Sequence, residues 1–108
     1  MAALVDAQIG PFKLTGTVSG EKLDADLTLS VEVEPGNVKT FPVTGSLLTE
    51  IKQDHRDPAF IGTIRFWTKK NDTGRHDLYG QLRGGFPTGG NESRHFETEE
   101  IKFTTLHF

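Results

Sequence analysis

The side chains best suited to chemistry gather in one stretch of the chain, residues 60–83. This stretch holds the only Trp and the only Tyr, together with the densest run of basic residues. Aromatic rings can stack on nucleobases and basic side chains can contact phosphates, and proteins that hold single-stranded nucleic acid combine the two. The candidate binding residues are Arg65, Trp67, Lys69, Lys70, Arg75, Tyr79 and Arg83.

The alternation of apolar and polar residues predicts that this stretch is a β-hairpin. Successive side chains of a strand point to opposite faces of a sheet. If Ile64 and Phe66 meet the leucines of the second strand in the core, the opposite face is aromatic and basic. The connecting loop, residues 69–75, is too long for a tight turn. The residues expected together on the outer face are Arg65, Trp67, Tyr79, Gln81 and Arg83.

Residues 67–79 resemble the last hairpin of some single-stranded DNA-binding proteins that have an OB-fold. The likeness rests on a Trp, a basic loop with Gly, and a Tyr. It implies that bases stack on Trp67 and Tyr79 while basic side chains follow the phosphates, and it assigns no family to the chain. The other interpretation is structural: Trp67 packs under residues 48–58 or against a partner subunit, and the basic side chains are solvated.

The other residues that could do chemistry do not form a recognisable active site. His55 lies between Asp54 and Asp57 in a charged segment, where it is expected to be solvated. His95 and Glu97 could share a face of a strand, but no third ligand at metal spacing accompanies them. The sequence has no nucleophile elbow, phosphate-binding loop or zinc motif. We therefore expect no enzyme, no metal and no cofactor.

The length and composition indicate one soluble domain that covers residues 1–108. The net charge is −3, but residues 1–51 carry three bases against seven acids, whereas residues 52–94 carry eight bases against five acids. This asymmetry could steer an anionic partner to the central hairpin. The sequence has no cysteine and no apolar run long enough to cross a bilayer. A cytoplasmic protein without membrane contact is expected.

Alternating apolar residues also predict strands before the hairpin. Residues 12–19 and 23–33 are expected to form two strands. A two-residue type II′ turn between them would pair Ser19 with Lys22. The next strand contains Pro42, which cannot donate a ladder hydrogen bond, so this strand should lie at a sheet edge or carry a bulge.

Three further segments are less regular. Residues 1–11 are expected to be a short lead-in, and residues 48–58 are a loop or a short helix. A last strand, or a bulged pair of strands, should run from about residue 94 to residue 108. The apolar alternation changes between Phe103 and Leu106, which is typical of a β-bulge.

Glycines at core-facing positions of four predicted strands indicate strong curvature. Glycine weakens a strand unless it serves bending or close approach. We therefore expect an all-β, mainly antiparallel domain that forms a closed or nearly closed barrel of about five to seven strands. An OB-like barrel is the first interpretation, and a lipocalin-like or other small barrel is the second. The glycines are Gly16, Gly45, Gly62 and Gly80.

The expected function is that of a non-enzymatic binding protein, with single-stranded nucleic acid as the partner of the hairpin face. One alternative is a barrel that binds a small molecule or carbohydrate, with residues 84–91 as a lid. Another is a structural protein that forms homo-oligomers or virion components through its strand edges and residues 106–108. Phosphate binding weakens steeply with salt, so salt dependence separates the first hypothesis from the others.

Overall fold

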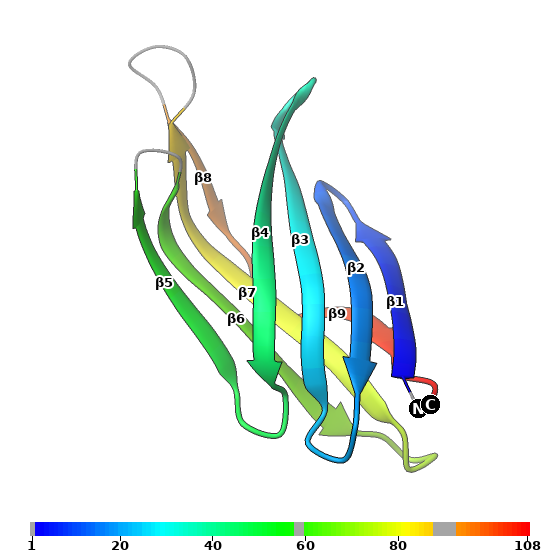
Figure 1. Ribbon diagram of the computed structural model, residues 1–108. Coiled ribbons are helices and arrows are strands. Elements are labelled where there is room, and N and C mark those ends of the chain that lie inside the picture. The colour runs from blue at the N-terminus through cyan, green and yellow to red at the C-terminus, as the bar shows by residue number, and fades with distance from the viewer. Residues whose placement is uncertain (1, 58–59, 88–92) are drawn as a thin grey trace.

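The described part of the chain folds into nine β-strands that form two antiparallel sheets (Figure 1). The computed structural model describes residues 2–57, 60–87 and 93–108; these contain no helix, and so none that could cross a membrane. The N-terminal sheet has the order β1-β2-β3-β4. The C-terminal sheet has the order β5-β6-β7-β8, and β9 also pairs with β7. The strands are β1 (Ala2–Ile9), β2 (Phe12–Ser19), β3 (Asp24–Glu34), β4 (Asn37–Ser46), β5 (Ile51–Asp57), β6 (Phe60–Lys70), β7 (His76–Pro87), β8 (Ser93–Glu97) and β9 (Ile101–Thr105).

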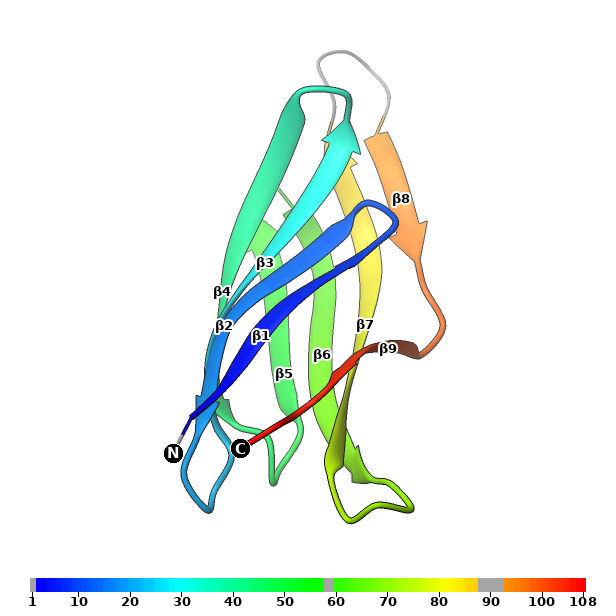
Figure 2. The same ribbon diagram turned by 90° about the vertical axis from the view of Figure 1, so that its right-hand side faces the viewer.

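The two sheets pack face to face as two layers (Figure 2). The turn from β4 to β5 takes the chain from one layer to the other, and β9 lies against β1. Within the described ranges, no backbone ladder joins β4 to β5 or β1 to β9. The expected all-β antiparallel architecture is confirmed. The expected barrel is not confirmed, because neither sheet is closed.

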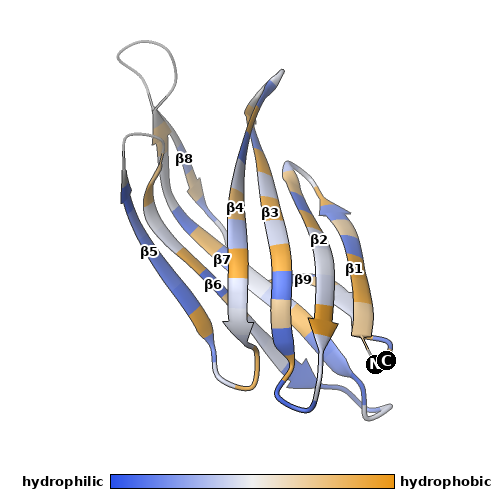
Figure 3. Cartoon of the chain, in the orientation of Figure 1, coloured by the Kyte–Doolittle hydropathy of each residue, from blue (hydrophilic) through white to orange (hydrophobic). Residues whose placement is uncertain are grey.

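Alternating apolar side chains supply the core from both layers. In β3, Leu27, Leu29 and Val31 are buried, and the residues between them are polar. The same alternation appears as bands of colour along the strands in Figure 3. β3, the long strand of this sheet, pairs with two neighbours, β2 and β4. Pro42 lies in β4 at the edge of the N-terminal sheet, as predicted.

The turn between β2 and β3 is longer than predicted, so the type II′ assignment is wrong. The ladder pairs Ser19 with Asp24 instead of Lys22, which leaves residues 20–23 as the loop. Leu23 has a φ of 51°, a left-handed conformation that costs a non-glycine residue about 1–2 kcal/mol. Its side chain is buried, and burial of a leucine contributes about 1.5–3 kcal/mol, which offsets the strain. Compared with the predicted pairing, the register of β2 on β3 is shifted by two residues. A shift by an even number leaves the same side chains facing the core.

Two strands were not predicted from the sequence. β1 occupies most of the expected lead-in, and β5 occupies the segment expected to be a loop or a short helix. β5 is mostly hydrophilic along its length (Figure 3). It is an edge strand of the C-terminal sheet, and among the described strands it pairs only with β6, from Ile51 opposite Phe66 to Asp57 opposite Phe60. A strand with one neighbour and one solvent-facing side needs few apolar residues, which explains the weak sequence signal.

The C-terminal segment forms two strands and carries the predicted bulge. β8 and β9 pair with different halves of β7. In β9, Lys102 lies opposite Tyr79 and Thr104 lies opposite Leu78, so Phe103 is the extra residue of the bulge. The bulge allows both Phe103 and Leu106 to be buried.

A row of aromatic rings joins the two layers. Phe41 of β4 meets Phe60 of β6 edge to face, with ring centroids 5.3 Å apart. Phe60 stacks in turn on Phe86 of β7, at 4.6 Å. Such pairs contribute about 0.5–1.5 kcal/mol beyond the burial of their area. In order across the molecule, with neighbouring centroids 4.6 to 5.7 Å apart, the row is His55, Phe41, Phe60, Phe86, Phe96 and Phe12.

A pair of glycines makes room for the central ring of this row. Gly62 and Gly84 lie opposite each other on β6 and β7. A Cβ atom would come within 2.8 Å of the Phe60 ring at Gly62 and within 2.6 Å at Gly84. A backbone carbonyl of the facing strand would be closer still, that of Arg83 to a Cβ at Gly62 and that of Ile61 to a Cβ at Gly84. The two glycines therefore allow the close approach of both the facing backbone and the Phe60 ring.

We expect Phe60→Ala to lower the free energy of unfolding by about 3–5 kcal/mol, because it removes the ring that contacts both layers. Urea denaturation should show a lower midpoint with an unchanged slope. Ile61→Ala is the matched control: Ile61 is the next residue on the same strand and is 61% exposed. It should change stability by no more than about 0.5 kcal/mol. Equal losses for the two variants would contradict the role given to the ring row.

Candidate binding face

β6 and β7 form the predicted hairpin with the predicted alternation. On the core side, Ile64 lies opposite Leu82, and Phe66 lies opposite Gly80. The residues between them therefore share the outer face, as the sequence pattern predicted. The pairs on this face are Thr63 with Arg83, Arg65 with Gln81, and Trp67 with Tyr79.

The aromatic rings and two cations of this face form a layered stack, here called the cation–π ladder. It consists of Arg65, Trp67, Tyr79 and Lys69. The two rings are nearly parallel, with an interplanar angle of 13° and centroids 6.2 Å apart. The Arg65 guanidinium lies over the Trp67 ring at 5.5 Å, and the Lys69 ammonium lies over the Tyr79 ring at 4.8 Å. Each such contact contributes about 0.5–1 kcal/mol at an exposed site.

Three glutamates that the sequence analysis did not place here neutralise the cations of this face. Glu50, from the turn before β5, pairs with Arg65. Glu100, from the connection between β8 and β9, pairs with Lys69 at 2.6 Å. Glu97 of β8 pairs with Arg83, also at 2.6 Å. The hydrogen bond from Lys69 to Glu100 raises the pKa of Lys69, so its ammonium stays charged.

A shallow open hollow lies beside the ladder, with a volume of about 440 Å³. The amide of Gln81 is held in place on both sides: its oxygen accepts from Arg65 at 3.3 Å, and its nitrogen donates to the Thr98 carbonyl at 3.2 Å. The hollow therefore presents two carboxylates, one guanidinium and one amide next to an indole ring. Its lining residues are Glu50, Arg65, Trp67, Gln81 and Glu100.

Two of the predicted binding residues do not join this face. Lys70 is four residues from Phe66 on the same strand, so it lies on the core side of the sheet and not on the outer face. It is at the exposed end of β6. Arg75 lies in the β6–β7 loop, where its guanidinium contacts His107 near the C-terminus. The structure therefore groups Arg65, Trp67 and three others of the predicted set, and it separates these two.

The loop after β6 is closed by a side-chain network that ends on a buried acid. The Asn71 side-chain oxygen accepts from the backbone of Thr73 at 2.9 Å and of Arg75 at 3.2 Å. Its amide nitrogen donates to Asp77 at 3.0 Å. Asp77 also accepts from the Thr105 hydroxyl at 2.6 Å. The hydrogen bond from Thr105, then that from Asn71 and the charge of Lys102, hold the pKa of Asp77 below its ordinary value.

The residues weighed for catalysis are placed differently from the expectation. His55 is not in a solvated loop but on β5, half-buried between the rings of Phe41 and Phe60. Its Nε2 atom is buried and has no hydrogen-bond partner in the described part of the chain. Glu97, the expected neighbour of His95, is paired with Arg83. No group of three or more potential metal ligands occurs among the described residues.

We expect Asp77 to make stability depend on pH in the acid range. Its folded-state pKa is depressed, so its contribution is complete above the unfolded pKa of about 4 and is lost as the pH falls through the folded value. Urea denaturation from pH 7 to pH 2 should therefore show Asp77→Asn less stable than the natural protein at neutral pH. The difference should shrink below about pH 4. A difference that stays constant over this range would contradict the assignment.

Comparisons with known proteins give no family for the chain. No family model matches the sequence. No curated protein matches it, and no solved structure matches the fold. The function is therefore argued from the geometry of the face described above.

Proposed function

We propose that the protein is a non-enzymatic carbohydrate-binding module that holds a neutral oligosaccharide in the hollow beside Trp67. The carrying observation is the charge balance of the hollow. Two carboxylates, Glu50 and Glu100, line it, and each is paired with a cation, Arg65 and Lys69 respectively. A phosphate in this position would therefore meet no net positive charge, whereas a sugar hydroxyl can donate to a carboxylate and accept from a guanidinium.

The fixed geometry of these polar groups supports the same ligand class. Glu50 is tied to Arg65, Arg65 to Gln81, and Gln81 to the Thr98 carbonyl. Side chains that are already immobilised lose little conformational entropy when a ligand binds. A ligand whose hydroxyls match this set therefore meets a prearranged surface.

The indole ring supplies the apolar part of the contact. Trp67 is half-buried, and its ring lines the hollow. A pyranose ring has a flat face of C–H groups, and such groups contact aromatic side chains favourably. The Arg65 guanidinium and the Tyr79 ring lie over the faces of the indole, so the sugar would contact the part of the indole that lines the hollow. Chains with β-1,4 linkages and equatorial substituents present this face repeatedly, so they are the natural first ligands to test.

A gap between the layers next to Phe66 and Phe103 is too small for a small-molecule ligand. It holds only about 10 Å³, about the minimum for one water. Residues 84–91 were expected to form a lid over a small-molecule site. Residues 84–87 belong to β7 instead, and residues 88–91 lie outside the described ranges. The outer hollow is therefore the better candidate.

The test is titration calorimetry with cellohexaose and chitohexaose. If the proposal holds, one of them binds, and Trp67→Ala weakens binding by more than about tenfold, since removal of a central aromatic contact typically costs over 1.4 kcal/mol. Ile61→Ala removes an exposed apolar side chain from the same strand and face. It should leave the affinity unchanged. Absence of binding, or equal effects of the two substitutions, would overturn the proposal.

Single-stranded nucleic acid is the second candidate, because Trp67 and Tyr79 do share one face with nearly parallel rings. The single Trp gives a direct readout: its fluorescence during titration with an oligothymidine, at low and at high salt. Saturable quenching that is lost at high salt would favour this candidate over the carbohydrate. Under the carbohydrate proposal we expect no response to oligothymidine at either salt concentration.

A further inference from the structure

The four strand edges of the two layers differ in how they are protected from pairing with another chain. In β4, Pro42 removes a backbone donor in the middle of the strand. β1 has β9 against it, and the edge opposite β5 is divided between two short strands, β8 and β9. Short edge strands and prolines are common protective devices. β5 has neither: it is seven residues long, pairs with β6 without a register shift, and contains no proline.

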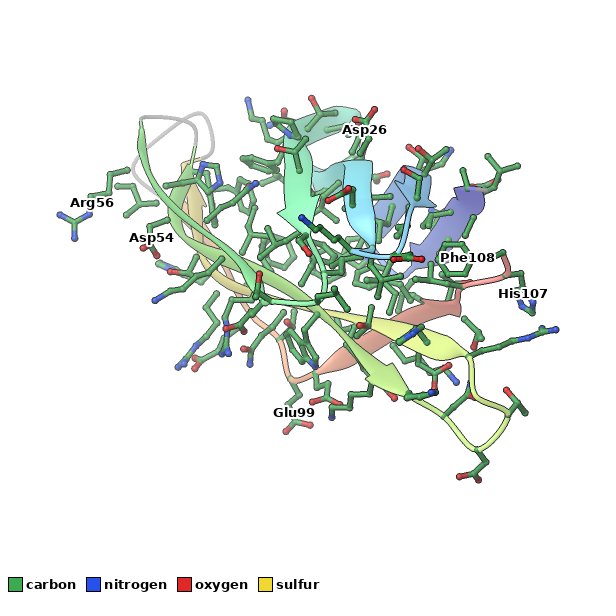
Figure 4. All side chains as sticks on the ribbon, turned by 60° about the horizontal axis from the view of Figure 1, so that its bottom comes forward. Asp26, Asp54, Arg56, Glu99, His107 and Phe108 are labelled. Carbon is green, nitrogen blue, oxygen red and sulfur yellow. The ribbon has the colours of Figure 1, made fainter. Side chains whose placement is uncertain are left out.

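The side chains of β5 carry a charge pattern that is complementary to itself. Lys52, Asp54 and Arg56 point to the outer face, and Glu50 precedes them with the same alternation. Figure 4 shows Arg56 projecting away from the molecule at this edge. The order along the strand is therefore acid, base, acid, base.

We propose that two copies of the chain pair antiparallel through β5, with Gln53 of each copy opposite the partner's Gln53 on the two-fold axis. In this register Lys52 lies opposite the partner's Asp54, and Glu50 lies opposite the partner's Arg56. Symmetry makes each pair occur twice, so four pairs of opposite charge face each other across the joint. Directly opposed charges of unlike sign stabilise antiparallel strands.

The charges also select this register against an adjacent one. A shift of two residues would bring Asp54 opposite the partner's Asp54, and Lys52 opposite the partner's Arg56. Like charges directly opposite each other destabilise strand pairing. The pattern therefore specifies one alignment by both attraction and repulsion.

A side chain on the inner face of β5, His55, gives an independent reason to expect a second copy at this edge. The Nε2 atom of His55 is buried and has no hydrogen-bond partner in the described part of this copy. Buried polar atoms are nearly always paired. In the proposed register His55 lies opposite the partner's Ile51, and the partner's Gln53 is its diagonal neighbour. A glutamine at a diagonal position is long enough to reach it, so the second copy supplies the missing hydrogen bond.

Solution mass tests the interface directly. The natural protein should show about twice its chain mass of 11.9 kDa by light scattering. Lys52→Glu places a glutamate opposite the partner's Asp54 at two symmetric positions. It should weaken self-association by at least about tenfold. The exchanged double variant, Lys52→Asp with Asp54→Lys, restores opposite charges and should restore the dimer. Lys13→Glu is the control for net charge, because Lys13 is exposed on β2 of the other sheet.

A cysteine scan tests the register itself. The chain has no cysteine, so Gln53→Cys can only pair with its own copy. Directly opposed Cα atoms are about 4.5–5.5 Å apart, within the range of a disulfide. We expect a covalent dimer on mild oxidation of Gln53→Cys, and none for Thr44→Cys on β4, which is exposed on another edge. A monomeric natural protein, a double variant that stays monomeric, or equal cross-linking of the two cysteine variants would overturn the proposal.

Discussion

The contact between Phe41, Phe60 and Phe86 is the interaction on which the rest of this structure depends. Within the described ranges the two sheets share no backbone ladder, so packing of side chains between the layers holds them together. Phe60 is the centre of this contact, because it touches a ring of the opposite sheet and a ring of its own. The paired glycines beneath it allow both this ring and the facing backbone to approach closely. The architecture is therefore a sandwich held by its interior, with open edges.

The same interior packing fixes the outer face. Phe66 lies over Gly80 and against Phe103, which locks the register of β6 on β7. A slip of one residue would turn every side chain of the hairpin to the other face. Because the core forbids that slip, Trp67 must lie beside Tyr79, and Arg65 and Lys69 must flank them. The cation–π ladder is thus a consequence of core packing on the reverse side of the same two strands.

Most of the correct predictions came from the alternation of apolar and polar residues along the strands. It placed the central hairpin, its outer face, the strand β3 and the bulge near Phe103. The missing backbone donor of Pro42 indicated the edge position of β4. The alternation did not find β5, because an edge strand with one solvent-facing side has little apolar signal. It also misjudged the turn at Leu23, where burial of a side chain outweighs an unfavourable backbone conformation.

The glutamates that pair with Arg65 and Lys69 could not be predicted from the sequence, because they are distant from these cations along the chain. Glu50 is 15 residues from Arg65, and Glu100 is 31 residues from Lys69. Such pairs depend on how turns and late strands return to the hairpin, and strand alternation alone does not specify those paths. The hairpin therefore looked basic in the sequence, whereas in the fold its main cations are neutralised. This charge balance is the observation behind our proposal of a neutral ligand.

The order of strands in the sheets has a consequence for how the chain folds. Every neighbouring pair in the sheet orders is consecutive in the sequence, except that β9 returns to β7. Contacts between consecutive strands close short loops, and short loops form quickly. The two meanders can therefore form as local units, and their docking through the aromatic row is the step that joins distant parts of the chain. Loss of this docking contact exposes the apolar faces of both meanders at once, so the domain should unfold as one cooperative unit.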